Sequence, residues 1–404
     1  MDVKNEILKS YFGFDNLKPE QSQIIDSILS GNDTIGLLPT GFGKSICFTI
    51  PALINDGLTI VITPLIALMA DQVKNLKNRF IKAEYINSLL EEYEKEIIYK
   101  KILDNRVKLL FIAGERLLNN KFLNIIKNIN VSLLVFDEAH TLLWSEDFRQ
   151  SLAKIPEFYK CFNKRPPILA LTATATNITV NKIKKILALN EPKLIIGDPD
   201  RKNIYYRIIK TSNKERELLS YLSKNKDKGL IYTLTIKNAE YLYYQLLELG
   251  YKVGLYHGNL DSNEKKRVQE LYTNGTLNLM VATNAFGMGI DIPNIRYVIE
   301  YDLPQSIEDF IQQTGRGSRD NKYAEGVLLF DRRDIGMNEY FIEHIKNENI
   351  SDKELNQIKL DRYQKLDKMI ELALTSRCIH QVASLYFGHK HNGKCMMCSN
   401  CKKK

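Results

Sequence analysis

The chain has 404 residues, which exceeds an average single domain and predicts two or three domains. Hydrophobic residues make up 44% and charged residues 26%, a composition typical of a globular protein. The sequence has no uncharged apolar run of about 18 residues and no signal-peptide core after Met1, so we expect a cytoplasmic protein without a membrane span.

The net charge is +9, from 57 Lys and Arg residues against 48 Asp and Glu residues. A positive charge favours polyanionic partners, because phosphate contacts release counterions. Lys, Asn and Ile are frequent throughout, so part of this charge reflects overall composition rather than a binding surface. The last fifteen residues are a more specific signal, because they contain five lysines and no acidic residue.

Short apolar strands alternate with amphipathic helices from about residue 34 to residue 196. After an apolar run that stops at Pro39, the expected strands are 58–63, 107–112, 131–136, 168–171 and 193–196. The expected helices include 46–53, 65–80 and 177–189. Such alternation predicts a parallel sheet covered by helices on both faces.

Residues 198–201 read as a linker, after which the alternation resumes. The expected strands are 204–209, 229–233, 253–256, 277–282, 297–300 and 327–330. From about Asn338 the strand pattern stops. We therefore predict an α/β fold with two tandem lobes, residues 1–198 and 199–337, followed by a small helical subdomain at 338–404.

The most informative stretch is 34–45, where an apolar run is followed by a glycine-containing loop and a helix. Gly41 and Gly43 permit backbone angles that turn their N–H groups toward an anion. Lys44 can reach nucleotide phosphates, and the Ser45 hydroxyl can ligate magnesium. Leu38 stands where the usual pattern has glycine, and an ordinary glycine-rich turn is the alternative.

The buried strand 131–136 ends in Asp137-Glu138-Ala139-His140. Carboxylates at the carboxyl end of a strand lie where parallel sheets bind their ligands. Asp137 is suited to hold magnesium through water, and Glu138 is suited to deprotonate an attacking water. An acidic strand end can also be a helix cap, but its combination with the phosphate loop favours ATP hydrolysis.

The second lobe contains Gln312-Gln313-Thr314-Gly315-Arg316-Gly317-Ser318-Arg319-Asp320. Arg316 and Arg319 are three residues apart and can face one anion. Their planar guanidinium groups suit the charge on a transferring phosphoryl group. The alternative is a solvated basic turn.

The six cysteines divide into two kinds. Cys47 and Cys161 stand alone in apolar surroundings and are expected in the core. The others, whose spacing suits one structural zinc ion, are Cys378, Cys395, Cys398 and Cys401. An iron–sulfur cluster is the second choice of metal. The neighbouring His380, His389 and His391 are expected at the surface.

In their order, these motifs resemble those of superfamily-2 helicases, and specifically the RecQ DNA helicases, over nearly the whole chain. The matching segments are 12–14, 18–21, 40–45, 63–65, 115–117, 137–140, 171–175, 256–258, 282–290 and 312–320. The four-cysteine spacing also resembles the RecQ zinc subdomain. The resemblance implies two RecA-like lobes and an ATP hydrolase that translocates 3′ to 5′ on single-stranded DNA, or on DNA with a single-stranded tail. It implies DNA repair or recombination as the process, and nucleoid association if the chain is bacterial.

The resemblance also assigns residues to ATP. Phe14 would stack on adenine beside Lys18, and Gln21 would read the adenine edge. Thr40 would belong to the phosphate loop, Asp291 would face the ribose, and Gln312 would help place the γ-phosphate or its water. ATP would bind between the lobes, where Arg316 and Arg319 would complete the site. The family has tyrosine and arginine where Phe14 and Lys18 stand, and a core aromatic is the alternative for Phe14.

The resemblance assigns DNA contacts to His257 and to an aromatic loop with Trp144, Phe148 and Arg149. Aromatic rings next to arginine suit base stacking and phosphate contact. The loop has one residue fewer than the family after His140, and Glu146 replaces a histidine. A buried Trp-Phe pair is the alternative for this loop.

Two other functions are open at this point: an RNA-remodelling ATPase, and a nucleic-acid-binding module with a vestigial ATPase. The sequence ends three residues after Cys401 without a counterpart of the family's winged-helix or C-terminal accessory domain. We therefore expect translocation on single strands and poor unwinding of blunt duplexes. The sequence does not indicate protein partners.

Overall fold

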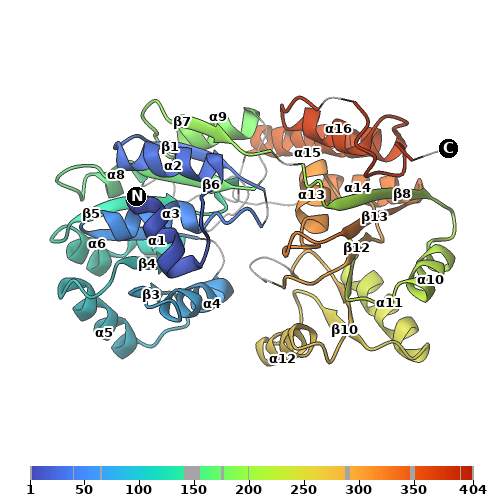
Figure 1. The fold of residues 1–404 in the computed structure, drawn as a ribbon, viewed down its shortest axis with the longest axis horizontal. Helices are drawn as coiled ribbons and strands as arrows, with labels where there is room; N and C mark the ends of the chain where they lie inside the picture. The colour runs from blue at the N-terminus through green and yellow to red at the C-terminus, as the bar shows by residue number, and fades with distance from the viewer. Residues whose placement is uncertain are drawn as a thin grey trace. The chain divides into compact units, whose positions relative to one another are not determined.

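The computed structural model describes residues 2–39, 41–63, 66–140, 155–173, 177–198, 200–286, 292–345, 351–391 and 393–402. The chain divides into two compact units, Met1–Asp198 and Pro199–Lys404 (Figure 1). In the described residues, no helix is long and apolar enough to cross a membrane.

The first unit contains a seven-stranded parallel sheet in the order β3-β4-β2-β5-β6-β1-β7. The strands are β1 (Thr34–Leu37), β2 (Leu58–Ile62), β3 (Ala83–Ile86), β4 (Leu109–Ile112), β5 (Val131–Phe136), β6 (Ile168–Thr172) and β7 (Lys193–Ile196). The helices are α1 (Val3–Ile7), α2 (Pro19–Leu29), α3 (Ile46–Ile54), α4 (Ile66–Lys77), α5 (Glu92–Leu103), α6 (Asn120–Ile126), α8 (Ile155–Tyr159) and α9 (Asn177–Ile186). A π-helical turn η1 (Leu8–Phe12) and a 3-10 turn η2 (Gly114–Leu118) complete this unit.

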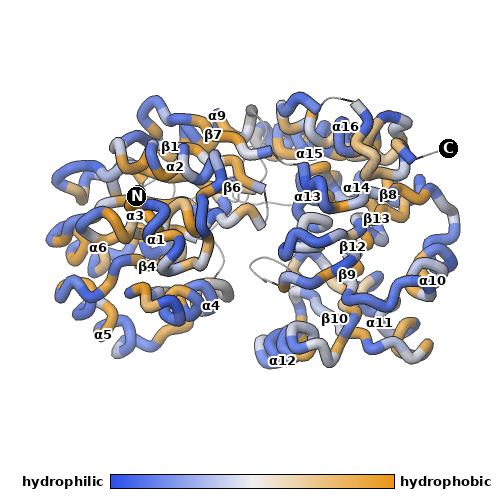
Figure 2. Tube along the Cα trace, in the orientation of Figure 1, coloured by the Kyte–Doolittle hydropathy of each residue, from blue (hydrophilic) through white to orange (hydrophobic). Residues whose placement is uncertain are grey.

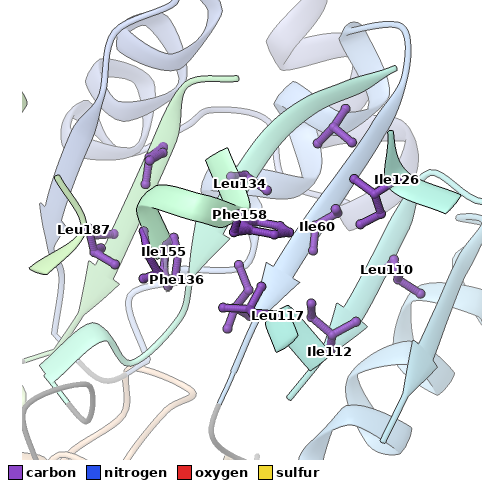
Figure 3. Close-up of a cluster of buried hydrophobic side chains, with 14 of the residues drawn as sticks. Ile60, Leu110, Ile112, Leu117, Ile126, Leu134, Phe136, Ile155, Phe158 and Leu187 are labelled. Atoms are coloured by element: carbon purple, nitrogen blue, oxygen red, sulfur yellow. The ribbon is translucent and has the colours of Figure 1, made fainter. Parts of the chain in front are cut away.

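Helices cover both faces of this sheet because its central strands are apolar on both sides. Successive residues of a strand point to opposite faces, so Leu134 and Val135 belong to different core clusters. Figure 3 shows the cluster on one face, where Leu134 and Phe136 of β5 lie near Phe158 of α8. Helices α2, α3 and α4 supply the cluster on the other face. The carboxyl ends of the parallel strands are thereby aligned along one edge.

The second unit contains a six-stranded parallel sheet in the order β10-β11-β9-β12-β13-β8. The strands are β8 (Ile204–Lys210), β9 (Gly229–Tyr232), β10 (Val253–Tyr256), β11 (Leu279–Ala282), β12 (Tyr297–Glu300) and β13 (Ala324–Phe330). The helices are α10 (Lys214–Lys224), α11 (Ile236–Glu248), α12 (Ser262–Thr273), α13 (Ile307–Thr314), α14 (Arg333–Glu343), α15 (Asp352–Leu374) and α16 (Ile379–Tyr386). Figure 2 shows α12 as mainly hydrophilic. This agrees with its exposure to solvent, because Val268 and Tyr272 are its only buried residues.

The C-terminal helices share a core with the second sheet. One cluster joins Tyr206 of β8 and Phe310 of α13 to Met369, Ile379 and Cys398. The backbone N–H of Tyr206 donates to the Met397 carbonyl at 3.1 Å, and the Ser399 N–H donates to the Tyr206 carbonyl at 2.9 Å. The cysteine-containing segment is therefore fixed against the edge strand β8.

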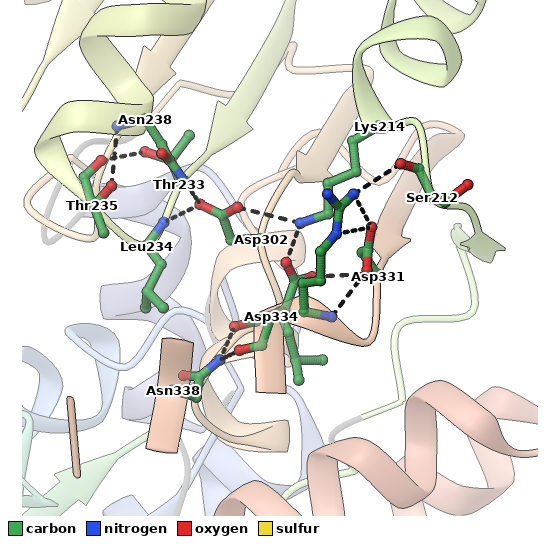
Figure 4. Close-up of polar contacts among 12 residues, drawn as sticks. Ser212, Lys214, Thr233, Leu234, Thr235, Asn238, Asp302, Asp331, Asp334 and Asn338 are labelled. Carbon is green, nitrogen blue, oxygen red and sulfur yellow. Dashed lines mark hydrogen bonds and ion pairs between the residues drawn. The ribbon is translucent and has the colours of Figure 1, made fainter. Parts of the chain in front are cut away.

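A buried polar network also stabilises the second unit (Figure 4). The Lys214 ammonium lies 3.3 Å from Asp302 and 2.5 Å from Asp334, and all three side chains are buried. The other Asp302 oxygen accepts from the Leu234 N–H and the Asn238 amide, each at 2.9 Å. Buried charges are tolerated when they are paired and hydrogen-bonded in this way. This network joins α10, α11 and α14 to the carboxyl ends of β9 and β12.

The predicted fold class is confirmed, because both units are parallel α/β lobes and helices follow the second sheet. Strands 131–136, 193–196, 253–256 and 297–300 have the predicted bounds. Strand β3 was not predicted. The division at residues 337 and 338 stays a prediction, because contacts place the helical segment in the same unit as the second sheet.

Candidate nucleotide and metal sites

The phosphate loop between β1 and α3 has the backbone geometry that its glycines predicted. Gly41 and Gly43 have φ values of +76° and +85°, in the left-handed region that favours glycine. A Cβ on Gly43 would lie 2.8 Å from the side-chain nitrogen of Gln21, so this position also lacks room for a side chain. The loop delivers Lys44 and Ser45 to the start of α3.

Lys44 and Glu138 form an ion pair across the strand ends, with 2.5 Å between Nζ and Oε1. Their side chains are only 15% and 18% exposed. Glu138 has a φ of +49°, which is unfavourable for a residue with a Cβ, and its N–H donates to Asp137 Oδ1 at 3.0 Å. The strand end therefore holds Glu138 toward the phosphate loop.

Asp137 is buried beside this pair. Burial, together with the neighbouring charge of Glu138, raises the pKa of Asp137 to about 6, while Lys44 opposes the shift. A divalent cation would favour the ionised carboxylate, because its positive charge replaces the stabilisation by water that burial has removed. The exposed Ser45 hydroxyl makes no capping hydrogen bond to α3. These two oxygen donors fit magnesium, which prefers hard oxygen ligands.

His140 links the acidic strand end to the next strand. Its Nδ1 lies 2.8 Å from the Thr172 hydroxyl at the end of β6 and 3.5 Å from Glu138 Oε2. The sequence motifs included both residues but did not indicate this contact. The contact depends on β5 and β6 being neighbours in the sheet.

The residues predicted to contact adenine lie beside the phosphate loop. The Gln21 amide nitrogen donates to the Phe42 carbonyl at 2.9 Å, and its oxygen accepts from the Lys18 N–H at 3.0 Å. Lys18 Nζ lies 4.0 Å from the centre of the Phe42 ring. Phe14 is 57% exposed, so the alternative of a core aromatic is wrong. Adenine contact by Phe14, Lys18 and Gln21 stays a prediction.

The arginine turn, residues 315–321, follows α13 in the second unit. Arg316 is only 7% exposed, so a solvated basic turn does not describe it. Arg319 and Gln312 are half-buried. The side-chain amide of Gln313 is best oriented with its nitrogen toward Glu300. In that orientation the nitrogen donates to both carboxylate oxygens of Glu300, at 3.1 and 2.8 Å. Burial and the nearby Asp309 and Asp302 raise the Glu300 pKa well above its ordinary range, while Arg316 opposes this.

The other predicted ligand contacts are less accessible or lie outside the described residues. His257 is 4% exposed, with Nε2 at 3.5 Å from Glu240, so its ring offers little surface in this conformation. Its role in DNA binding stays a prediction. The predicted residues that fall outside the described part of the chain are Thr40, Trp144, Phe148, Arg149 and Asp291.

The four C-terminal cysteines lie together, with all their sulfurs within 4.8 Å of one another. The sulfurs of Cys395 and Cys401 are 3.8 Å apart, and those of Cys378 and Cys398 are 4.0 Å apart. Four sulfurs bound tetrahedrally at about 2.3 Å from one zinc ion would stand about 3.8 Å apart. The cysteines therefore fit a single zinc ion.

The three histidines near this cluster are less exposed than the sequence predicted. His380 was expected at the surface but is 1% exposed. Its Nδ1 is hydrogen-bonded to Asp200, and its Nε2 lies 2.9 Å from the Met397 carbonyl. Burial is possible because both polar ring atoms have partners. His389 and His391 are half-buried. Cys47 is buried as predicted, whereas Cys161 is only half-buried.

Three family matches agree with this geometry. Residues 18–183 match the DEAD/DEAH box helicase family, and residues 213–321 match the helicase conserved C-terminal domain. Residues 332–402 match the RecQ zinc-binding family, and this range includes all four clustered cysteines. The zinc assignment is therefore supported by both the sulfur positions and the family match.

The chain is 37% identical over 401 residues to the ATP-dependent DNA helicase RecQ of Bacillus subtilis, which covers 98% of this chain and 66% of that protein. It is 32% identical over 354 residues to RecQ of Synechocystis, which covers 83% of this chain and 74% of that protein. The chain spans only 62% to 66% of the B. subtilis, Pasteurella multocida and Haemophilus influenzae RecQ proteins.

A solved structure with the same fold is the helicase MrfA bound to DNA and AMPPNP. The TM-score is 0.69 at 16% identity, and the match covers 97% of this chain and 58% of that one. At this identity the likeness concerns the fold alone. The family matches and the similarity to RecQ proteins along most of the chain show that the chain belongs to the RecQ family of helicases.

Proposed function

We propose that the chain hydrolyses ATP and uses the energy to translocate along DNA, as a helicase core in DNA repair or recombination. The observation that carries this proposal is the pairing of Lys44 with Glu138 beside the buried Asp137. These residues meet at the carboxyl edge of a parallel sheet, where such sheets bind nucleotides. Membership of the RecQ family favours DNA as the polymer.

In this proposal, Lys44 exchanges its contact with Glu138 for nucleotide phosphate. Glu138 is then available to orient and deprotonate the attacking water. Asp137 and Ser45 would hold magnesium, which neutralises phosphate oxygens when bound. Gln312, Arg316 and Arg319 would act on the transferring phosphoryl group, because arginine suits its developing charge. The remaining ATP contacts would come from Phe14, Lys18, Gln21, Thr40, Gly41, Gly43 and Asp291.

DNA would be single-stranded or carry a single-stranded tail, with translocation in the 3′ to 5′ direction. Trp144, Phe148 and Arg149 would stack on bases and contact phosphates, and His257 would support DNA contact from the second unit. The lysines near the end of the sequence add positive charge for the phosphate backbone. We also propose 1–198, 199–337 and 338–404 as domain boundaries, with zinc stabilising the last segment.

One experiment separates this proposal from its alternatives: ATPase rates with single-stranded DNA, with RNA and without polynucleotide. We expect strong stimulation by DNA and little by RNA. Stronger stimulation by RNA would support an RNA-remodelling enzyme. This outcome is worth testing because a relative that is 33% identical to the chain is named putative ATP-dependent RNA helicase R290. Absence of hydrolysis under all three conditions would support a binding module with a vestigial ATPase.

A further inference from the structure

The segment that enters the second unit contacts both the cysteine cluster and the arginine turn. We call residues 200–203 the entry segment. Asp200 is hydrogen-bonded to His380, and its other oxygen lies 3.6 Å from His391 Nε2. Arg201 donates to the carbonyls of Gly315 at 3.3 Å and Ser318 at 2.8 Å. Two adjacent residues thus face two different functional regions.

The arginine turn has a backbone that requires support. Ser318, directly before Arg319, is fully buried and has a φ of +55°, which is unfavourable for a residue with a Cβ. Such conformations persist where the surroundings fix them, and they are frequent at functional sites. The Ser318 N–H donates to the Ile295 carbonyl at 2.8 Å. Asn203 donates to the Ser318 hydroxyl at 2.9 Å.

Arg201 adds two hydrogen bonds to this support. The two carbonyls that it binds, at Gly315 and Ser318, stand on either side of Arg316 in the sequence. A planar guanidinium group can bind two acceptors in a fixed geometry, which a lysine cannot do. Loss of Arg201 would therefore remove one hydrogen bond at each end of the segment that carries Arg316, while the contacts of Ser318 with Asn203 and Ile295 remain.

The other end of the entry segment is tied to the cysteine cluster. His380 lies two residues after Cys378, and its Nε2 contacts the carbonyl of Met397, which lies between Cys395 and Cys398. The Asp200 contact with His380 therefore joins the entry segment to both halves of the cluster. Because Asp200 precedes Arg201 directly, displacement of one changes the position of the other.

We propose that Arg201 is a positioning residue for Arg316 and Arg319, and that Asp200 couples this position to the zinc-binding segment. The proposal rests on the proposed function, in which these arginines act on the transferring phosphoryl group. It predicts that Arg201 affects the chemical step and leaves nucleotide binding unchanged, because Arg201 contacts the turn rather than the phosphate loop.

The test is ATPase kinetics of Arg201→Ala at saturating single-stranded DNA. We expect kcat to fall by about tenfold to 100-fold with KM for ATP nearly unchanged, as for other small misplacements of catalytic groups. Affinity for ADP with aluminium fluoride should fall by a similar factor, while ADP affinity stays constant. Arg201→Lys should give an intermediate loss. Arg207→Ala is the matched control, since Arg207 is a partly exposed arginine in the same unit that pairs with Glu325 at 3.4 Å.

A double-mutant comparison identifies the route of the effect. If Arg201 acts through the turn, Arg201→Ala should lower kcat little further in an Arg316→Ala/Arg319→Ala background. An equal fold-loss in both backgrounds would overturn the positioning role. If Arg316→Ala/Arg319→Ala retains normal kcat, the proposed function is wrong about these arginines. If that double variant loses activity while Arg201→Ala does not, only the positioning proposal fails.

The proposed coupling of Asp200 to the cysteine cluster can also be tested by measurements other than ATPase activity. Asp200→Asn should speed trypsin cleavage after Arg201 and lower kcat by a smaller factor than Arg201→Ala. Bound zinc, measured by mass spectrometry, should stay at the wild-type level, so that loss of the contact is distinguished from loss of the metal. Unchanged cleavage and kcat in Asp200→Asn would overturn the coupling.

Discussion

Lys44 Nζ lies 2.5 Å from Glu138 Oε1, so the lysine proposed to bind phosphate is paired with the carboxylate proposed to activate water. Both side chains are largely buried, which strengthens their attraction relative to an exposed pair. In the proposed function, each group changes its partner when nucleotide binds. On that proposal, the ion pair would restrain both groups until phosphate competes for Lys44.

Replacement of the two partners should have different effects. Lys44→Ala should abolish hydrolysis and weaken ATP binding while leaving most DNA binding intact, because Lys44 is proposed to contact only nucleotide. Glu138→Gln should abolish hydrolysis and retain bound ATP, since phosphate and magnesium contacts persist. Rapid filtration with labelled ATP, together with steady-state ATPase rates, measures both effects.

Lys77→Ala is the control for this pair, because Lys77 forms an ion pair of similar length, 2.7 Å, with Glu84 in the same unit. It should retain normal turnover, because Lys77 belongs to none of the predicted motifs and Glu84 keeps a second ion pair with Lys101 at 2.7 Å. Normal turnover in Lys44→Ala or Glu138→Gln would show that the nucleotide site has been assigned to the wrong residues.

The fold could be predicted largely because most strands are continuous apolar runs buried on both faces. Strand β5 has its predicted bounds for this reason, and all of its residues except Ser132 are buried. Strand β3 was missed because it has only four residues, of which Glu84 and Tyr85 are half-buried. A short edge strand of this kind lacks both the apolar run and a regular alternation.

The candidate site could be predicted as separate motifs but not as contacts. The motifs indicated Lys44 and Glu138 individually, whereas their pairing depends on the order of strands in the sheet. His380 was misjudged because its partner Asp200 lies 180 residues earlier in the chain. No local pattern shows that a distant carboxylate and a backbone carbonyl satisfy both ring nitrogens.

Phe14→Ala should raise KM for ATP with little loss of stability. The side chain is exposed, so its removal leaves no cavity, whereas loss of adenine stacking would weaken binding by about 1 kcal/mol. Phe14→Tyr should restore affinity because the ring is kept. Thermal unfolding and nucleotide titration measure the two effects. An unchanged KM for ATP in Phe14→Ala would exclude the stacking role.

Phe148→Ala tests the predicted DNA-sensing loop. If this aromatic contacts DNA, DNA-stimulated hydrolysis should fall more than basal hydrolysis, because stacking on bases is lost. ATPase rates with and without single-stranded DNA provide the comparison. Equal losses accompanied by a lower unfolding temperature would favour the buried Trp-Phe alternative, in which the change creates a cavity.

Glu300→Gln should make the protein more stable than wild type at alkaline pH. The raised pKa of Glu300 means that the folded chain holds this proton more tightly than the unfolded chain, whose carboxyl has an ordinary value of 4.5. The contribution of Glu300 to the free energy of unfolding is therefore greatest below pH 4.5 and falls as the pH rises toward the folded pKa. A glutamine keeps the shape and stays neutral, so the advantage of the variant should grow with pH.

Urea unfolding between pH 5 and pH 9 measures this difference, with Glu264→Gln as the control. Arg267 holds the pKa of the exposed Glu264 below its ordinary range, so that replacement should produce a small effect of opposite sign. A stability difference between Glu300→Gln and wild type that does not change with pH would contradict a raised Glu300 pKa.

Cys398→Ser, or removal of zinc, should loosen the C-terminal segment while the first unit keeps its stability. Cys398 is fully buried in the cluster that joins this segment to Tyr206 and Phe310, so zinc loss should also expose the β8 edge. Metal binding supplies much of the folding free energy of small cysteine-bound segments. Cys161→Ser is the control, because Cys161 lies in the first unit outside the cluster.

Hydrogen exchange measured by mass spectrometry should show lost protection in α16, residues 393–402 and β8, with β1 to β6 unchanged. DNA affinity should fall and its dependence on salt should flatten, because Lys390, Lys394 and Lys402 would no longer be held in place. Part of the ATPase activity should survive at saturating DNA, since every proposed nucleotide contact precedes residue 321. Full protection of α16 after zinc removal would show that the apolar cluster, rather than the metal, holds this segment together.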